Sequence, residues 1–383
     1  MRSRALDYLI RITKGLKEKS LSPFLAQIDT VHVVCYTVKY RKYVYEVNMD
    51  EQVRKRVFSG VQPTGKVTLG NYLGAIRNWK PLQEQYDCIY CVVDLHSLTV
   101  SQVPAELRKN TMELVALYIA CGIDPDKSTL FIQSHVHEHA ELAWILDTVS
   151  YVGELNRMTQ FKDKSRKHAD NINMGLMNYP VLMASDILLY QADYVPVGKD
   201  QVQHVELTRD VAERFNSRYS DTFVVPETLI NKSGQSIKSL LDPSAKMSKS
   251  DPNDNALISL SDDADTVRRK LRRAVTDSDT SVRHGADKPA ITNLLNIYTL
   301  CSGLSMSEAE KQFEGKGYGE FKDAVADAVI SVLQPIQAEQ KRLLADKGYL
   351  ESVLKQGAEQ ASYIASKTLS KVYRKVGLIP RIR

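Results

Sequence analysis

Cysteine is scarce in this chain. Only five cysteines are spread over 383 residues, and this odd, thin distribution argues against a disulfide-stabilised secreted fold and for reduced thiols in the cytoplasm. Cys88 and Cys91 form a CxxC pair, but they lie within CIYCVVD, an apolar, β-branched run that predicts a buried strand. Residues three apart on a strand point to opposite faces. We therefore expect neither a metal site nor a redox pair here.

Long hydrophobic runs are missing as well. No stretch approaches the roughly eighteen consecutive apolar residues that a transmembrane helix requires, so we expect no membrane partner. With 43% hydrophobic and 25% charged residues, the composition is close to the average of globular proteins and excludes a disordered or fibrous class. The length of the chain is enough for two domains.

An excess of positive charge is present only near the N-terminus. The formal net charge is +5, and residues 1–48 alone hold nine basic and four acidic residues, which leaves 42 of each sign for the rest. A neutral main body can bind nucleic acid only through local basic patches. The run VRRKLRR at 267–273 is such a patch, although a solvated helix face explains this pattern more often.

The first 48 residues differ in kind from the rest. A basic amphipathic start precedes a β-like stretch rich in Tyr and Val, and Met49 then opens a charged lead into the first clear strand. Three interpretations remain open: an upstream in-frame extension of the true start, a genuine appended segment, or an organelle transit peptide. The acidic residues Asp7 and Glu18 weaken the last of these. We treat residues 1–52 as an N-terminal extension that is poorly ordered or lies upstream of the true start.

Beyond Val57, short apolar runs alternate with helical periodicity. Strands are predicted at 57–60, 88–94 and 128–134, and helices at 71–86, 104–122, 139–152, 179–191 and 199–219. After about residue 250 only helical patterns remain, at 263–275, 291–303, 321–346 and 351–377. Alternating strands and helices build a parallel sheet. The predicted class is therefore α/β, with a Rossmann-like catalytic domain at 53–245 and an all-helical C-terminal domain at 246–383.

Two sequence motifs carry the chemistry. In FSGVQPTGKVTLGNYLGA, residues 58–75, a strand ends in a loop with Gly and Pro and a helix begins close to Gly70, which is a favourable place for an anion. Tight packing would explain this motif about as well. In AKMSKSDPN, residues 245–253, two lysines three apart lie in a loop between Pro243 and Pro252. Compact positive charges on such a loop suit a polyphosphate.

Together these motifs resemble the signatures of class I aminoacyl-tRNA synthetases, and among them the bacterial-type tryptophan enzymes. The first signature, usually of HIGH type, is TLGN at 68–71, and the second is KMSKS at 246–250. The resemblance runs from about Arg56 to near the C-terminus. It implies attachment of L-tryptophan to tRNA(Trp) through a tryptophanyl-adenylate, in a homodimer that uses ATP and Mg²⁺ without a dedicated protein metal site.

The resemblance also assigns the residues around ATP. It implies catalytic roles for Lys246, Lys249, Lys164, Thr68 and Asn71. It implies ATP contacts for Gln62, Pro63, Thr64, Gly70, Asn71, Gly198, Lys199, Asp200, Ile237, Lys246, Met247, Ser248, Lys249 and Ser250. One departure is Lys199, because relatives often have an acidic residue at this position of the VGKDQ segment. This difference could alter nucleotide affinity.

The choice of amino acid is expected to depend on Asp186. A carboxylate on a predominantly apolar helix needs a buried partner, and the indole N–H of tryptophan supplies one. The alternative from the residues alone is a carboxylate that caps a neighbouring backbone group. By resemblance, the rest of the tryptophan pocket comprises Phe58, Tyr179, Met183, Gln160, His96, Val195 and Val197. The spacing of His135, His137 and His139 suggests a metal site, but these residues span a strand end and a helix start, where they need not converge.

Two other functions remain possible. The first is a tyrosyl-tRNA synthetase, which shares the architecture but must bind a phenolic hydroxyl. The TLGN and MASDILLY contexts fit the tryptophan enzyme better. The second is a synthetase-like regulator that binds tryptophan or RNA without charging tRNA. Loss of the signature lysines would have favoured it, and both are intact.

Overall fold

The chain forms two compact units, Met1–Arg54 and Lys55–Arg383. The computed structural model describes residues 32–34, 44–46, 54–167, 172–198, 201–229, 237–249 and 251–379. In the first unit, β1 (His32–Val34) pairs with β2 (Val44–Glu46) in antiparallel fashion, which confirms the β-like pattern of that stretch. The remaining residues of the predicted N-terminal extension lie outside the described ones.

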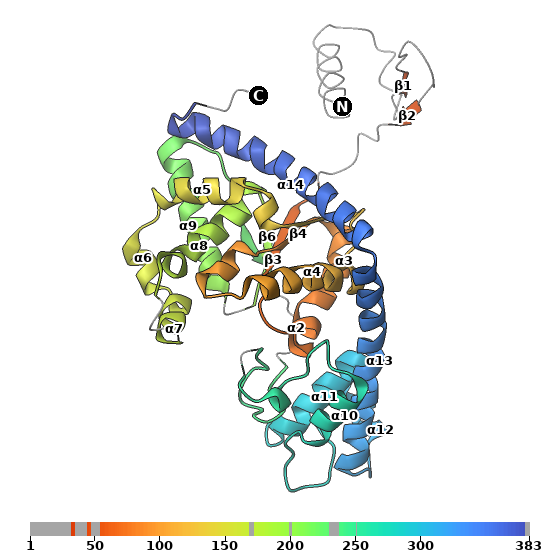
Figure 1. The fold of residues 1–383 in the computed structure, drawn as a ribbon. Coiled ribbons are helices and arrows are strands. Elements are labelled where there is room, and N and C mark those ends of the chain that lie inside the picture. The colour runs from red at the N-terminus through yellow and green to blue at the C-terminus, as the bar shows by residue number, and fades with distance from the viewer. Residues whose placement is uncertain are drawn as a thin grey trace, which may run out of the picture. The chain divides into compact units, whose positions relative to one another are not determined.

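A five-stranded parallel sheet forms the centre of the second unit (Figure 1). Its strands are β3 (Arg56–Val61), β4 (Asp87–Val92), β5 (Thr129–Ile132), β6 (Tyr194–Pro196) and β7 (Glu227–Leu229), in the order β5-β4-β3-β6-β7. The three strands predicted from the sequence are confirmed, whereas β6 and β7 were not anticipated. The strand order reverses between β3 and β6, where open α/β sheets bind their ligands.

Both faces of the sheet are buried under helices. Along β4 the side chains alternate: Cys88 and Tyr90 join one hydrophobic core, and Ile89 and Cys91 join the other. The first core includes α4 (Pro104–Ala120), and the second includes α5 (Glu138–Asp147), α8 (Met174–Leu189) and α9 (Val202–Tyr219). The two cysteines of the CxxC pair therefore lie on opposite faces, as predicted.

One predicted helix is interrupted. The segment expected to be a single helix at 71–86 comprises α2 (Leu69–Gly74), a 3₁₀ turn (Ile76–Asn78) and α3 (Trp79–Gln85). Pro81 explains the interruption, because its ring would clash with the carbonyl of Arg77 in a continuous helix and because it has no N–H to donate. Further short elements are the 3₁₀ turns Leu95–Thr99, Gln133–His135 and Asp254–Ala256, and the helices α6 (Val152–Arg157) and α7 (Thr159–Lys167).

The C-terminal part is helical, as predicted. It contains α10 (Ala264–Arg272), α11 (Pro289–Ser302), α12 (Met306–Gln312), α13 (Tyr318–Ala345) and α14 (Lys347–Val376). The hydrophobic core that includes α4 continues into α10, α11 and α13, so the sheet and the helices share one interior. The domain boundary near residue 245 lies inside this unit and stays a prediction. Among the described helices, none has the length and apolar character needed to cross a membrane.

Helix α14 returns to the sheet and packs along its edge strand β5 (Figure 1). At the contact, Gly357 lies so close to the backbone of Leu130 that an added Cβ would clash with the Leu130 carbonyl oxygen. Thr129 Oγ1 also donates a hydrogen bond to Gln360 Oε1 at 3.2 Å. The helix thus covers the outward-facing peptide groups of an edge strand, which would otherwise be open to pairing with other chains.

We expect Gly357→Ala to destabilise the protein. Alanine favours a helix over glycine by about 1 kcal/mol, but overpacking against a backbone atom costs about 1–3 kcal/mol or more, so the clash should win. Gly348→Ala, in the first turn of the same helix, is the control, because its Cβ would meet only Asp346 Oδ1 at 3.9 Å. Urea unfolding should show a lower midpoint for Gly357→Ala alone. Equal midpoints for the two variants would contradict this packing.

Candidate active site

The candidate active site lies at the carboxyl ends of β3 and β6. After β3 the chain continues into Gln62, Pro63 and Thr64, and then turns at Gly65, whose φ of +72° suits glycine. After β6 it continues into Val197 and Gly198. These are two of the segments that were expected to contact ATP. The structure therefore brings them to the switch point of the sheet.

The first signature forms the start of helix α2. Thr68 is buried and caps the helix: its Oγ1 accepts a hydrogen bond from the backbone N–H of Asn71 at 3.2 Å, and its own N–H donates to Asn71 Oδ1 at 3.1 Å. This reciprocal pair is a capping box. Because the side-chain oxygen of Asn71 is used within the helix, its amide Nδ2 is the group that it can offer to a ligand. Direct contacts of Thr68 and Asn71 with ATP stay predictions.

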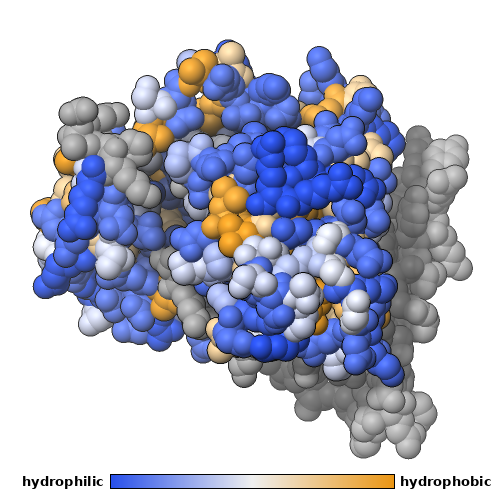
Figure 2. Space-filling view, turned by 90° about the horizontal axis from the view of Figure 1, so that it is seen from below, coloured by the Kyte–Doolittle hydropathy of each residue, from blue (hydrophilic) through white to orange (hydrophobic). Residues whose placement is uncertain are grey.

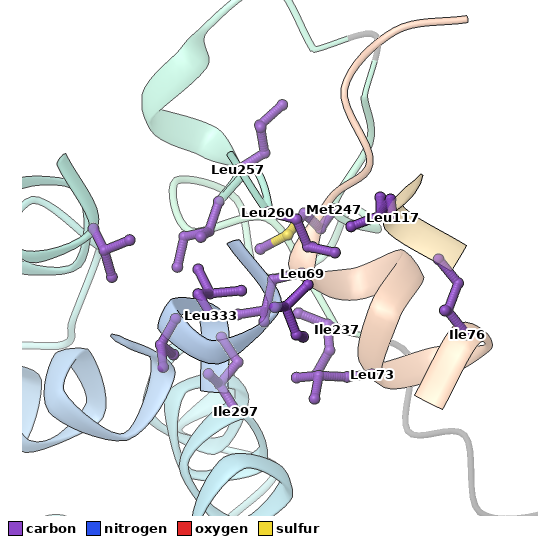
Figure 3. Close-up of a cluster of buried hydrophobic side chains, with 14 of the residues drawn as sticks. Leu69, Leu73, Ile76, Leu117, Ile237, Met247, Leu257, Leu260, Ile297 and Leu333 are labelled. Carbon is purple, nitrogen blue, oxygen red and sulfur yellow. The ribbon is translucent and has the colours of Figure 1, made fainter. Parts of the chain in front are cut away.

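The two signatures touch each other. An added Cβ on Gly70 would lie 3.4 Å from Met247 Cβ and 3.6 Å from Ile237 Cβ. Met247 is buried, and its backbone N–H donates to the carbonyl of Ile237 at 3.0 Å. Figure 3 shows Met247 in one hydrophobic cluster with Leu69 and Ile237. The methionine of KMSKS is thus an anchor that holds the lysine-bearing loop against the TLGN helix.

Positive charge gathers beside the loop that follows β3. Lys249 Nζ donates to the carbonyl oxygen of Thr64 at 2.6 Å. The pKa of Lys164, on α7, is lowered first by burial and then by the positive charge of Lys249. Lys246 and Ser248 lie on the same exposed loop. Like charges brought together in this way favour binding of a polyanion.

Three of the predicted ATP contacts cannot be placed. Lys199, Asp200 and Ser250 lie outside the described residues. Gly198 is exposed and immediately precedes one gap, and Ile237 is buried and follows another. The effect of the unusual Lys199 therefore stays a prediction.

Asp186 lies at the centre of a buried polar cluster. Its side chain is almost fully buried, and its Oδ1 accepts hydrogen bonds from Gln133 Nε2 at 2.7 Å and from His139 Nδ1 at 2.6 Å. Its Oδ2 accepts from His96 Nε2 at 2.8 Å. His139 Nε2 in turn hydrogen bonds with the hydroxyl of Tyr190 at 2.7 Å. The carboxylate is thus held by three side chains rather than by a backbone group.

This arrangement leaves Asp186 charged and with one acceptor position to spare. Burial alone would raise the pKa of Asp186, but the hydrogen bond from His139 and the charge and hydrogen bond of His96 outweigh it and lower the pKa below its usual value. A carboxylate has about four lone-pair sites. Three accept the bonds above, and the fourth, on Oδ2, can accept an indole N–H. Binding of an indole N–H by Asp186 stays a prediction.

Aromatic rings connect this cluster to the lysines. The His96 and Tyr179 rings lie edge to face at a centroid distance of 6.3 Å, and Lys164 Nζ lies 4.0 Å from the Tyr179 ring centroid. Phe58 stacks on Tyr190 at 5.5 Å. Of the other residues predicted for the tryptophan pocket, Val195 is buried, and Met183, Val197 and Gln160 are half-buried. A path of contacts thus leads from Asp186 to the ammonium group of Lys164.

The three alternating histidines do not converge on one point. His139 is bound to Asp186 and Tyr190, and His137 lies beside Glu138 at 3.5 Å. His135 instead lines an open surface hollow with Lys355, on α14. Sequence analysis missed Gln133 and His139 as partners of Asp186. Gln133 directly follows β5 and His139 lies in the first turn of α5, and this position after the carboxyl end of a strand was the signal that could have identified them.

The basic run at 267–273 is partly buried and partly exposed. Arg268 pairs with Asp327 at 2.6 Å, and Arg272 pairs with Asp323 at 2.9 Å. Lys270 is fully buried. Arg269, Arg272 and Arg273 are exposed, so a solvated helix face and a contact with nucleic-acid phosphates both stay predictions for this run.

Comparison with known proteins agrees with this geometry. The family model described as tRNA synthetases class I (W and Y) matches residues 50–334. The chain belongs to this family. The resemblance of the two signatures is confirmed, and so is the α/β fold with a parallel sheet and a helical C-terminal region.

Individual members of this class I synthetase family match most of the chain. The tryptophan–tRNA ligase of Clostridium acetobutylicum is 56% identical over 327 residues, which cover 85% of this chain and 98% of that protein. The crystal structure of tryptophanyl-tRNA synthetase from Mycoplasma pneumoniae has a TM-score of 0.78 at 38% identity and covers 85% and 98% of the two chains. The Campylobacter jejuni enzyme complexed with ADP and tryptophan has a TM-score of 0.75 at 34% identity, with 84% and 100% covered.

Proposed function

We propose that this protein attaches L-tryptophan to tRNA(Trp) through a tryptophanyl-adenylate. The observation that carries the proposal is the series of contacts from Asp186 through His96 and Tyr179 to Lys164, whose pKa is also lowered by the charge of Lys249. It supports a carboxylate acceptor for the indole N–H and lysines for the phosphates in one region of the protein. The ligase relatives at 54–56% identity support the same substrate. Few, widely separated cysteines agree with a protein that functions in the reducing environment of the cytoplasm.

In the first step, the carboxylate of tryptophan attacks the α-phosphorus of ATP. A carboxyl–phosphate bond forms, the bond to the β-phosphate breaks, and pyrophosphate leaves with the electron pair. No protein nucleophile is needed, so catalysis depends on position and on stabilisation of charge. Lys249, Lys246 and Lys164 would stabilise the departing pyrophosphate. In the second step, a ribose hydroxyl of the terminal adenosine of the tRNA attacks the carbonyl carbon, and AMP leaves.

Mg²⁺ fits this site as a companion of ATP. Among the described residues, no group of three or more His, Cys, Asp or Glu side chains could hold a metal ion, and Lys249 donates to the Thr64 carbonyl. When bound to the phosphates, Mg²⁺ would neutralise part of their charge. The lysines would bind the phosphate oxygens that Mg²⁺ does not bind.

The proposal is tested by two assays on the full chain. Tryptophan-dependent exchange of pyrophosphate into ATP should occur, and tyrosine should support it far less well. Purified tRNA(Trp) should then accept tryptophan. Better activation of tyrosine would favour the tyrosyl enzyme, while tryptophan binding without exchange or charging would favour the regulator.

We further propose that the protein is a homodimer and that an apolar surface around α5 and α8 forms the interface. Large side chains are exposed there: Leu98 by 61%, Trp144 by 74%, Tyr151 by 58% and Met174 by 74%. Their elements are joined, because Asn178 Nδ2 donates to Asp147 Oδ2 at 2.9 Å and Asn173 Nδ2 donates to the Thr99 carbonyl at 3.0 Å. On the face seen from below, by contrast, hydrophobic residues form only small patches (Figure 2).

We expect Trp144→Glu to weaken the dimer. A buried tryptophan at an interface commonly contributes about 2–4 kcal/mol, which corresponds to a rise in the dissociation constant of roughly 30-fold to 10³-fold. Sedimentation velocity over a concentration series measures this. Val275→Glu is the control, since Val275 is exposed by 42% in the helical part, away from α5 and α8. A monomeric wild-type protein, or equal dissociation constants for both variants, would refute the assigned interface.

A further inference from the structure

Lys270, on α10, is a buried cation held by two carboxylates. Its ammonium is fully buried and lies 2.8 Å from Asp262 Oδ2 and 2.8 Å from Asp254 Oδ2. A buried charge is costly unless it is paired, and removal of one partner of a buried pair is strongly destabilising. Neither signature contains this lysine. Both of its partners, however, belong to the segment that follows KMSKS.

The first partner connects Lys270 to the TLGN signature. Asp262 Oδ2 also accepts a hydrogen bond from the backbone N–H of Ser259 at 2.9 Å. Ser259 forms a β-bridge with Thr68, and the N–H of Leu69 donates to the carbonyl of Ile258 at 2.8 Å. The turn that Lys270 holds through Asp262 is therefore the surface on which helix α2 begins.

The second partner connects Lys270 to the loop before that helix. Asp254 Oδ1 lies 3.2 Å from Lys66 Nζ. Lys66 belongs to the segment between the ATP loop and TLGN. The pKa of Asp254 is lowered by the hydrogen bonds that it accepts, first from Lys270 and second from Lys66. Lys66, Asp254 and Lys270 thus form a continuous chain of ion pairs that spans the two signature regions.

We propose that Lys270 is a positioning residue for adenylate formation. By holding Asp262 and Asp254 together, it fixes the segment after KMSKS against the TLGN helix and keeps Lys249 beside Thr64. A misplacement of about 1 Å at a reacting group can cost on the order of 10²-fold in rate. This inference rests on the proposed function, because it concerns the step in which ATP reacts.

A second buried lysine offers a matched control. Lys288 is exposed by only 3% and lies 3.1 Å from Asp277 Oδ2 and 2.8 Å from Asp279 Oδ2. Its ammonium also donates to the hydroxyl of Tyr318 at 2.9 Å. This cluster joins the loop before α11 to α13 and includes no residue of either signature. Its loss should lower stability in the same way without moving the ATP site.

The test compares Lys270→Met with Lys288→Met in the full chain, at a temperature where circular dichroism shows both folded. We expect Lys270→Met to lower kcat/KM for ATP in tryptophan-dependent pyrophosphate exchange by roughly 10–100-fold, with the Kd for tryptophan, measured by calorimetry, unchanged. Lys288→Met should retain nearly wild-type kinetics. Equal kinetic losses in the two variants, or no loss in Lys270→Met, would overturn the proposal.

Asp254→Asn decides the question if Lys270→Met does not fold. Asp254 is exposed by 55%, so its neutralisation leaves no buried carboxylate unpaired, and Lys270 keeps Asp262. We expect Asp254→Asn to raise the KM for ATP about 3–10-fold. Because Lys66 and Asp254 act as one pair, the double variant Lys66→Met/Asp254→Asn should have a KM for ATP little higher than that of either single variant. A wild-type KM would overturn the proposal. Absence of exchange in the wild-type protein would instead refute the proposed function.

Discussion

Lys249→Ala is expected to slow tryptophan-dependent pyrophosphate exchange by roughly 10²–10³-fold, the scale for loss of one preorganised electrostatic contact. The ammonium of Lys249 lies beside the ATP loop, 2.6 Å from the Thr64 carbonyl, and its charge is felt by Lys164. Charge that builds up on the pyrophosphate as it leaves would lose this partner. The affinity for tryptophan should barely change, because the indole pocket is predicted from other side chains.

An exposed lysine elsewhere gives the control for this prediction. Lys109 is exposed by 71% and forms only an i,i+4 pair with Glu113, so Lys109→Ala should leave the exchange rate unchanged. Exchange by Lys249→Ala within about twofold of wild type would contradict the phosphate role of the KMSKS loop. Lys246→Ala should behave like Lys249→Ala, since both lysines belong to the same loop.

The fold was predictable where the sequence signal is local. Strands β3, β4 and β5 were identified because continuous apolar, β-branched runs are buried on both faces of a parallel sheet. Strands β6 and β7 have three residues each and are defined by their pairing with each other and with β3, which no local pattern reports. The break before α3 was missed because the apolar periodicity continues across Pro81.

The site was predictable only in part, for the same physical reason. The strings TLGN and KMSKS carry their own signal, and the structure shows them in contact through Gly70 and Met247. The partners of Asp186 lie far away in sequence, at Gln133 and His139, and only the order of the strands brings them to the carboxylate. The clamp at Lys270 was hidden within a basic run that predicted a solvated face.

Asp186→Ala is expected to reduce kcat/KM for tryptophan by several orders of magnitude. A site that hydrogen bonds a substrate N–H discriminates against an analogue that lacks the N–H by about 10⁴–10⁵-fold, whereas a difference of one methylene in an apolar pocket is discriminated by only about 10–200-fold. The substitution also removes the common acceptor of His96, Gln133 and His139. Because each of these buried donors then lacks its partner, the melting temperature should fall too. Kinetics must therefore be measured well below that temperature.

A substrate analogue separates recognition from this loss of stability. In the benzothiophene analogue of tryptophan, sulfur replaces the indole N–H, so wild-type protein should strongly prefer tryptophan in the exchange assay, and Asp186→Ala should lose most of that preference. The ratio of the kcat/KM values for the two substrates, measured on one variant, does not depend on the fraction of that protein that is folded. Asp186→Asn keeps an acceptor oxygen but not the charge and should fall between wild type and Asp186→Ala. If Asp186→Ala activates tryptophan normally, or retains the wild-type preference over the analogue, then Asp186 is a structural partner of the two histidines and the indole N–H is bound elsewhere.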